Sequence, residues 1–362
     1  STPSHVERID SSGHEVQGFP PESDLRAQRI QAFEHRRRQL LDAERRYQEV
    51  LLENKTLMRE VLCGYVRGMR RAEQLLMVLA DIVCNDGALV ALMNLMGTQD
   101  IGDEFFYHSL NTAILSMVVA RALEFSQDDV HTVGMGALFH DIGETTDTGE
   151  ILYKGGNLSR KQREALRRHP QVGKRMVEKG FNFPQPGLDI ILQHHERLNG
   201  CGYPYGLTDE QIHLFTKVVM VADTYDDLCN NPVLEKSLTP YEAMCALYAR
   251  RRSEFWEEAV VAMIGSLGVY PPSSVVELSN GAIGVVCTIN PENRLRPLVL
   301  LYEPHTPRQE ALILNLMEEP TLHIKRGLRP SQLPRDVWDY LNPRNMIRYF
   351  AYTPTEPQTP AI

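Results

Sequence analysis

The stretch from His194 to Pro204 reads His-His-Glu-Arg-Leu-Asn-Gly-Cys-Gly-Tyr-Pro, and it decides how the rest of the chain is interpreted. It ends an apolar segment, residues 188–192, and passes at once into a turn rich in Gly, Asn and Pro. Neighbouring side chains on a helix point about 100° apart, so adjacent histidines rarely serve one packed face. They can instead reach two metal ions that lie side by side, while the glycines let the backbone approach a ligand closely. The stretch therefore indicates a metal site beside a ligand-binding loop.

The composition narrows the class of protein. The chain has 362 residues, of which 43% are hydrophobic and 23% charged, as in a soluble globular protein. A net charge of −9 argues against a binder of nucleic-acid polymers, which would show a basic footprint. No apolar run reaches the ~18–20 residues that span a bilayer. The six cysteines are scattered without a Cys-x-x-Cys pair, so we expect a cytoplasmic protein with reduced thiols and no membrane span.

The N-terminal third divides into a tail and a helical region. Residues 1–22 are rich in Ser, Pro and Gly and predict a flexible tail. Residues 23–98 predict a helical region, because apolar residues recur every three or four positions and no Gly or Pro interrupts them before Gly64. A helix that long needs a partner, so we expect this region to be regulatory and to hold a homodimer together.

The rest of the sequence changes once from a helical pattern to a strand-like pattern. Residues 99–270 read as successive helices, whereas residues 271–362 contain short Val-rich segments separated by turns such as Asn280-Gly281. The predicted fold is therefore mainly α: a helical bundle preceded by a long helical N-terminal region, with a small antiparallel β extension at the C-terminus.

Histidines and carboxylates recur in apolar helical settings through the bundle. A single histidine there is more often a hydrogen-bonded core residue, and a lone Asp could be a satisfied buried carboxylate. Eight together instead suit a cluster of divalent ions with mixed imidazole and carboxylate ligands. A lone zinc site fits less well, because no cysteine joins the set. The eight candidate ligands are Glu104, His108, His140, Asp141, His169, His194, His195 and Asp223.

Two or three such ions suit the hydrolysis of a phosphodiester. One ion lowers the pKa of a bound water and yields hydroxide, while its neighbours hold the phosphate and the leaving oxygen. In this scheme Asp141 bridges two ions with His140 beside it, and no protein nucleophile is needed.

The order of these motifs resembles the HD-GYP family, a branch of the HD phosphohydrolases that act on cyclic di-GMP. The resemblance runs from about Asp103 to Gly281, and it includes the complete His-His-Glu-x-x-x-Gly-x-Gly-Tyr-Pro pattern at 194–204. The other segments that carry it are 103–111, 136–143, 151–154, His169-Pro170, Gly206-Leu207, 221–226 and 271–281.

The resemblance implies an HD-type helical bundle with a centre of two or three metal ions, usually iron or manganese. It implies opening of cyclic di-GMP to linear pGpG, with GMP as the final product of some members. The implied ligands are His108, His140, Asp141, His169, His194, His195 and Asp223, with Glu104 added where a third metal is present. Gly202, Tyr203 and Pro204 would line the substrate groove and contact a signalling partner.

The chain departs from the family where the substrate phosphate would be held. The family motif His-Asp-x-Gly-Lys here ends in Glu144, and Glu235 stands in a second region where the family carries basic residues. Losing one charge-assisted phosphate contact typically costs ~1.5–3 kcal/mol. Lys154 is a candidate substitute. Two alternatives therefore stay open beside hydrolysis of cyclic di-GMP: a metal-loaded binding module with weak or no turnover, and a hydrolase of another phosphoester. A bland surface exchange at Glu144 is a further possibility.

Overall fold

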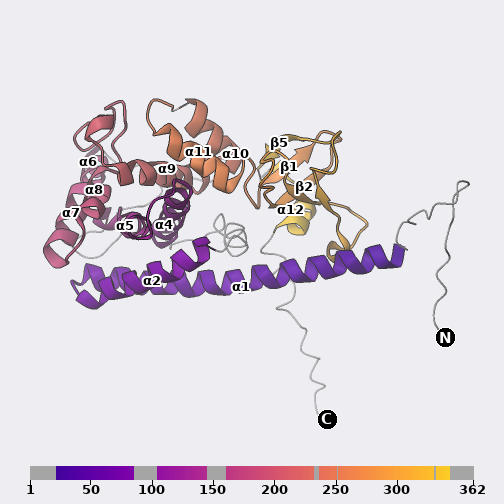
Figure 1. The fold of residues 1–362 in the computed structure, drawn as a ribbon, viewed down its shortest axis with the longest axis horizontal. Helices are drawn as coiled ribbons and strands as arrows, with labels where there is room; N and C mark the ends of the chain where they lie inside the picture. The colour runs from indigo at the N-terminus through magenta and orange to yellow at the C-terminus, as the bar shows by residue number, and fades with distance from the viewer. Residues whose placement is uncertain are drawn as a thin grey trace, which may run out of the picture.

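The computed structural model describes residues 22–84, 104–144, 160–231, 236–250, 252–329 and 332–342. It is mostly helical and ends in a small antiparallel sheet, so the predicted fold class is confirmed (Figure 1). The predicted tail up to Pro21, Lys154 and Glu235 lie outside the described residues. Among the described helices, none is both long and apolar enough to cross a membrane.

The helical part is built from two long N-terminal helices and a series of shorter ones. The long pair is α1 (Glu22–Leu62) and α2 (Val66–Cys84). The others are α4 (Glu104–Ala122), α5 (Gln127–Leu138), η1 (Ile142–Glu144), α6 (Arg160–Leu166), α7 (His169–Gly180), α8 (Gln185–Gln193), η2 (Asp209–Gln211), α9 (Leu214–Cys229), α10 (Pro240–Cys245), the π-helical turn η4 (Ala246–Arg250) and α11 (Glu257–Leu267).

The long helical pattern of the N-terminal region is broken once, at Gly64. This residue has a φ of 75°, and the Tyr65 N–H donates to the Glu60 carbonyl while the Gly64 N–H donates to the Val61 carbonyl. These two bonds are those of a Schellman motif, which needs a residue in the left-handed region and therefore favours glycine. The chain consequently folds back, and α2 packs along α1 (Figure 1).

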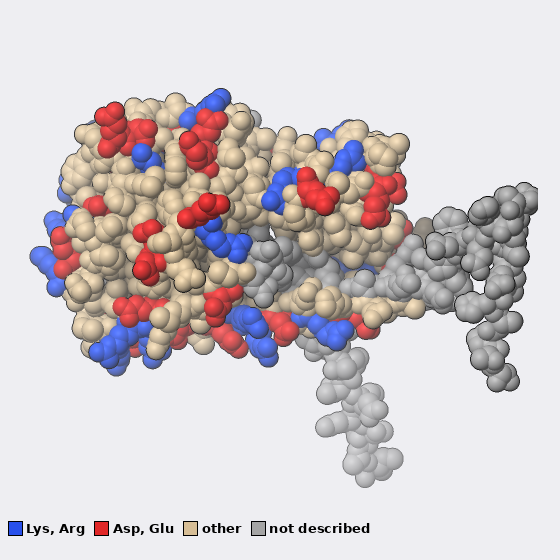
Figure 2. All heavy atoms as spheres, viewed as in Figure 1, with Lys and Arg blue, Asp and Glu red and all other residues tan. Residues whose placement is uncertain are grey.

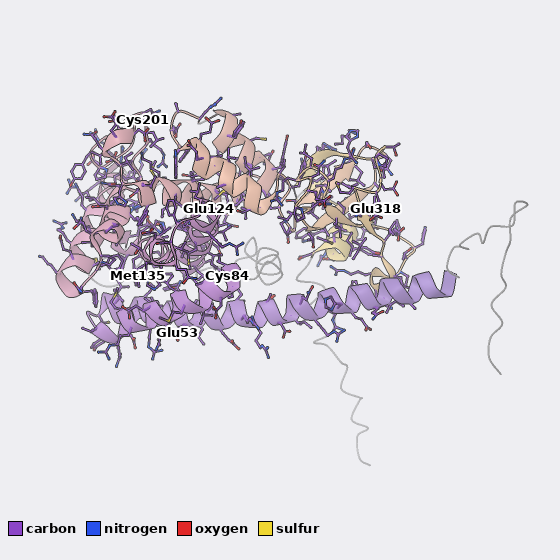
Figure 3. The ribbon with its side chains drawn as sticks, viewed as in Figure 1. Glu53, Cys84, Glu124, Met135, Cys201 and Glu318 are labelled. Atoms are coloured by element: carbon purple, nitrogen blue, oxygen red, sulfur yellow. The ribbon has the colours of Figure 1, made fainter. Side chains whose placement is uncertain are left out.

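The helices share one hydrophobic core. Leu57 of α1, Leu76 of α2 and Leu110 of α4 are fully buried in the same cluster. Figure 3 labels Glu53 on α1, whose carboxylate pairs with Arg71 of α2 at 2.7 Å. The helix α4 is buried on nearly all sides, which explains why its sequence is apolar all round. It therefore forms the centre of the bundle.

The C-terminal unit is a five-stranded antiparallel sheet. Its strands are β1 (Val275–Leu278), β2 (Ile283–Thr288), β3 (Leu298–Leu301), β4 (Ile313–Asn315) and β5 (Ile324–Leu328), in the order β4-β3-β2-β1-β5. One face packs against α12 (Arg335–Leu341), and the short helix η5 (Arg308–Glu310) contacts α1. The first three strands follow the Val-rich segments of the sequence.

Two side-chain pairs are among the contacts that join this unit to the helical bundle. The rings of Tyr241 on α10 and Tyr270, which precedes β1, stack with centroids 4.8 Å apart. Arg329, just after β5, pairs with Glu242 at 3.1 Å. Figure 2 shows acidic and basic side chains interspersed over the visible face, without a broad area of one sign among the described residues.

Candidate metal centre

The candidate ligands come from α4 and from the helices that meet beside it. His108 lies on α4, and the His140-Asp141 pair follows the end of α5. His169 is the first residue of α7, His194 caps the end of α8, and Asp223 lies on α9. Five segments far apart in the sequence thus converge on one point, three of them through side chains at helix ends or in the turn after α5.

The structure gathers seven of the eight candidates into two groups. One group holds Asp141, His169, His194 and His195, and the other holds His108, His140 and Asp223; in each group the possible ligand atoms lie within 4.8 Å of one another. Glu104 belongs to neither group, but it lines the cavity onto which they open. The adjacent histidines of the sequence therefore lie in one group rather than in two.

Four of the histidines have one ring nitrogen already engaged by the protein. The Nδ1–H groups of His140, His169 and His194 donate to the carbonyls of residues 137, 166 and 191, three positions upstream, at 2.7–3.0 Å. The Nδ1–H of His108 donates to the Asp226 carboxylate at 2.8 Å. In the neutral ring, with Nδ1 protonated, Nε2 is the nitrogen left to bind a metal ion. Metal-ligating histidines characteristically have this arrangement.

The bare nitrogens face one another. Nε2 of His140 lies 3.2 Å from Nε2 of His108, and Nε2 of His169 lies 3.0 Å from Nε2 of His194. Two acceptors at this distance cannot satisfy each other, so each pair needs a shared cation or proton. A buried set of imidazole and carboxylate donors of this kind fits divalent transition metals.

Asp141 lies between the two groups. Its Oδ1 is 3.1 Å from Nε2 of His169 and 3.3 Å from that of His194, while its Oδ2 is 3.2 Å from Nε2 of His140. Burial raises the pKa of this carboxyl, but the neighbouring imidazoles of His140, His169 and His194 lower it more, and the pKa lies well below its usual range. Asp141 is therefore anionic, with one oxygen toward each group.

Close backbone packing holds the loop after Asp141 against α7. A Cβ on Gly143 would lie 2.1 Å from the His169 carbonyl oxygen and 2.5 Å from the Gly173 nitrogen. No side chain fits there, so glycine at this position lets η1 approach the first turn of α7. The placement of His169 opposite Asp141 depends on this approach.

The two groups open onto a cavity of about 360 Å³. Among the residues that line it, one is basic, Arg197, whose guanidinium donates to the carbonyls of His194 and Glu196. Glu144 also lines the cavity and is 7% exposed, and burial together with the Asp141 carboxylate raises the pKa of Glu144 well above its usual range. The acidic lining residues are Glu104, Asp141, Glu144, Asp223, Asp226 and Asp227.

The Gly-Tyr-Pro loop reaches the cavity through Tyr203, which is one of its lining residues. The Tyr203 ring stacks on His195 with centroids 4.6 Å apart, and the Arg167 guanidinium lies 4.6 Å from the centre of the same ring. A Cβ on Gly202 would lie 2.4 Å from the Arg197 nitrogen, so this glycine also allows a close approach. Pro204 follows Tyr203 in the loop. The loop thus touches the candidate metal group through Tyr203.

Two functional residues were missed by the sequence reasoning. Glu196 is fully buried and accepts from the N–H groups of Tyr205 and Leu207 at 2.8 and 2.9 Å, which fixes the loop. Asp226 orients His108, as described above. The spacing of Asp226 three residues after Asp223 places both on one face of α9 and could have signalled it.

None of the six cysteines, all of which lie among the described residues, forms a disulfide. In Figure 3, Cys84 at the end of α2 and Cys201 in the loop after α8 lie far apart, and both are exposed. Neither joins the two candidate metal groups, whose members are histidines and aspartates.

Comparison with known proteins finds two domain families that match parts of the chain, and several similar proteins. The HD domain family matches residues 94–258, and a KOW domain associated with the HD domain matches residues 275–335. The cyclic di-GMP phosphodiesterase PA4108 of Pseudomonas aeruginosa is 33% identical over 62% of this chain and 53% of its own length. The cyclic di-GMP phosphodiesterase response regulator RpfG of Xanthomonas campestris is 35% identical over 41% of this chain and 39% of its own.

Other similarities are more distant. A 3'3'-cGAMP-specific phosphodiesterase of Vibrio cholerae is 27% identical over 45% of this chain and 35% of its own length. The solved structure of Bd1817, an HD-GYP-type protein from Bdellovibrio bacteriovorus, has a TM-score of 0.49 and 21% identity, covering 59% of this chain and 69% of that one. The chain thus spans about half, or less, of the length of the curated relatives it matches. Residues 94–258, which contain the two His/Asp groups, match the HD domain family, so the expected resemblance to the HD phosphohydrolases is confirmed at the level of this domain.

Proposed function

We propose that this chain is a metal-dependent phosphodiesterase that hydrolyses cyclic di-GMP to pGpG. The observation that carries the proposal is Asp141, whose two oxygens face two separate groups of imidazole nitrogens. The names of the similar proteins, which act on cyclic di-GMP or on 3'3'-cGAMP, support the substrate class. Whether cleavage continues to GMP is a further outcome of the assay given below.

The chain's own residues would each have a defined task. Asp141 would bridge two ions, and the remaining members of the two groups would complete their ligand sets, with Glu104 the candidate for a third ion. Bound divalent ions would activate water and withdraw charge from the phosphate. His195 and Tyr203 would present the stacked wall against which a flat base can pack. Glu196 would keep that wall in place.

Iron or manganese is the proposed metal. The donor set mixes imidazole nitrogen with carboxylate oxygen and contains no thiolate, which suits these ions. Metal analysis of protein purified without oxygen, coupled to product analysis with cyclic di-GMP, tests metal and substrate together. Metal-loaded protein that leaves cyclic di-GMP intact would refute the proposal.

A second candidate function is a metal-loaded receptor that binds the nucleotide and turns it over weakly, and the buried Glu144 favours it. Replacing Glu144 with Lys restores the family's basic residue beside the cavity. We expect tighter cyclic di-GMP binding by about tenfold to a hundredfold, because one charge-assisted phosphate contact is regained. Calorimetric titration and turnover measurements check this prediction.

The matched control is Glu144→Gln, which removes the acid without adding a cation and should give a smaller gain. Metal content must be equal in all three proteins. If neither variant changes affinity or turnover, Glu144 does not face the phosphate, and the receptor hypothesis loses its support. A hydrolase of another phosphoester would instead reveal itself in a substrate panel.

We also propose a homodimer through the N-terminal helices. Leu52 on α1 and Met77 on α2 are 67% and 65% exposed, and Val66 and Val78 add apolar surface. We expect the double variant Leu52→Glu, Met77→Glu to be monomeric by light scattering, because two charges would be buried in the interface. The control Val261→Glu, on exposed α11 surface, should stay dimeric. A wild-type monomer would overturn this proposal.

Two further assignments complete the proposal. A signalling partner would contact the Gly-Tyr-Pro loop, where Tyr205 is 58% exposed beside the cavity wall. We place the protein in the cytoplasm, because its six cysteines form no disulfide.

A further inference from the structure

Two buried polar side chains of α1 reach α4 on either side of His108. Asn54 donates from Nδ2 to the Phe106 carbonyl at 2.9 Å and to the Ser109 hydroxyl at 3.0 Å. Tyr47, 1% exposed, donates from its hydroxyl to Oδ1 of Asn111 at 2.8 Å. The N-terminal helix therefore holds the segment of α4 that carries a candidate metal ligand.

The hydrogen bond from Tyr47 is the first of a chain of hydrogen bonds that ends at His108. Asn111 donates from Nδ2 to Oδ1 of Asp226 at 2.9 Å, and His108 donates from Nδ1 to Oδ2 of Asp226 at 2.8 Å. Asn111 and Asp226 are buried, and Asn230 donates to the same carboxylate at 2.8 Å. Three hydrogen bonds thus connect α1 with a ring whose other nitrogen lies 3.1 Å from Asp223.

The direction of each bond follows from the chemistry of the groups. A carboxylate only accepts, so Asn111 must turn its NH₂ toward Asp226 and its carbonyl oxygen toward Tyr47. The Tyr47 hydroxyl is the donor that matches this orientation. Without that donor, the amide loses a partner that fixes how it is turned, and the donor that it offers Asp226 is held less firmly.

We propose that Tyr47 is a positioning residue for the metal-binding group of His108, His140 and Asp223, so that α1 sets the metal affinity of this group. The proposal rests on the proposed function only in requiring that this group binds a metal. Residues that hydrogen-bond to a metal ligand typically change metal affinity about 10–100-fold when they are replaced. Tyr47 acts through two intervening side chains, so we expect a smaller effect of about threefold to tenfold.

The test is Tyr47→Phe, which keeps the ring and its packing on Tyr107 and removes only the hydroxyl. Apoprotein is titrated with Mn²⁺, and free Mn²⁺ is followed by electron paramagnetic resonance. We expect one Mn²⁺ to bind about threefold to tenfold more weakly and the other to be unchanged. Turnover lost at limiting Mn²⁺ should return at excess Mn²⁺.

Tyr302→Phe is the matched control, because it removes a hydroxyl that bonds Asp336 at 3.0 Å within the C-terminal unit. It should leave both Mn²⁺ affinities unchanged. A double-mutant cycle adds Asp226→Asn: if Tyr47 acts through Asp226, the effect of Tyr47→Phe disappears in that background.

The outcomes separate the two proposals. Wild-type protein that binds no Mn²⁺ refutes the metal site itself, and with it the proposed function. Wild-type binding with unchanged affinity in Tyr47→Phe, an equal change in Tyr302→Phe, or additive effects with Asp226→Asn overturns the positioning role alone.

Discussion

Asp141→Ala is expected to lower cyclic di-GMP hydrolysis by about three orders of magnitude and to reduce the bound metal at the same time. The reason is geometric, since its two oxygens face the two groups and no other described carboxylate lies within 4 Å of imidazoles from both. Without it, His169 and His194 lose the carboxylate that lies 3.1 and 3.3 Å from their Nε2 atoms, and Asp223 remains beside His108 and His140. Metal analysis and single-turnover kinetics on the same preparation measure both effects.

Asp128→Asn is the control for the loss of one carboxylate, because Asp128 lies exposed in the first turn of α5. It should keep wild-type metal content and rate. Asp141→Asn separates charge from shape: it preserves the volume but supplies a single acceptor, so we expect a loss close to that of Ala. An Asp141→Ala protein that retains both its metal and its rate would exclude the bridging role.

Gly143→Ala is expected to destabilise the protein by ~2–3 kcal/mol and to weaken metal binding. The added Cβ would lie 2.1 Å from the His169 carbonyl oxygen, and both of the nearest atoms are backbone, so η1 and α7 must move apart. Overpacking of this kind typically costs ~1–3 kcal/mol. His169 begins α7, so its imidazole moves with the helix. Thermal unfolding with and without Mn²⁺ measures both effects.

The control for Gly143→Ala is a glycine at the far end of α7, away from η1. Gly180 ends α7, and nothing lies within 4 Å of a Cβ built there. Gly180→Ala should therefore be neutral or slightly stabilising, because alanine loses less conformational entropy on folding. Equal melting temperatures for the two variants would show that η1 and α7 separate at no cost.

The candidate site could be predicted largely from sequence because its residues occur as local doublets. His140-Asp141 and His194-His195 each stand at the end of an apolar helix, and such ends converge in a bundle. The sequence did not predict the residues that hold these ligands in place through hydrogen bonds. Asp226 holds His108 across 118 positions, and Tyr47 meets Asn111 across 64, and no spacing rule connects residues so far apart.

In the fold, too, local sequence patterns predicted some elements and not others. Periodicity predicted the helices, and Val-rich runs predicted β1, β2 and β3, because both patterns are local. The strands β4 and β5 have little apolar alternation of their own; pairing with β3 and β1 defines them. The fold-back at Gly64 depends on one residue, whose left-handed backbone ends a pattern that otherwise reads as continuous helix.

The helix α1 has a mechanical consequence. Its 41 residues make a rod about 60 Å long that passes under both the C-terminal unit and the bundle (Figure 1). Near its C-terminal half it carries Tyr47 and Asn54, and along its length it touches η5. Because α1 contacts η5 as well as the part of α4 that carries His108, a shift of the C-terminal unit along α1 would act on the position of that histidine.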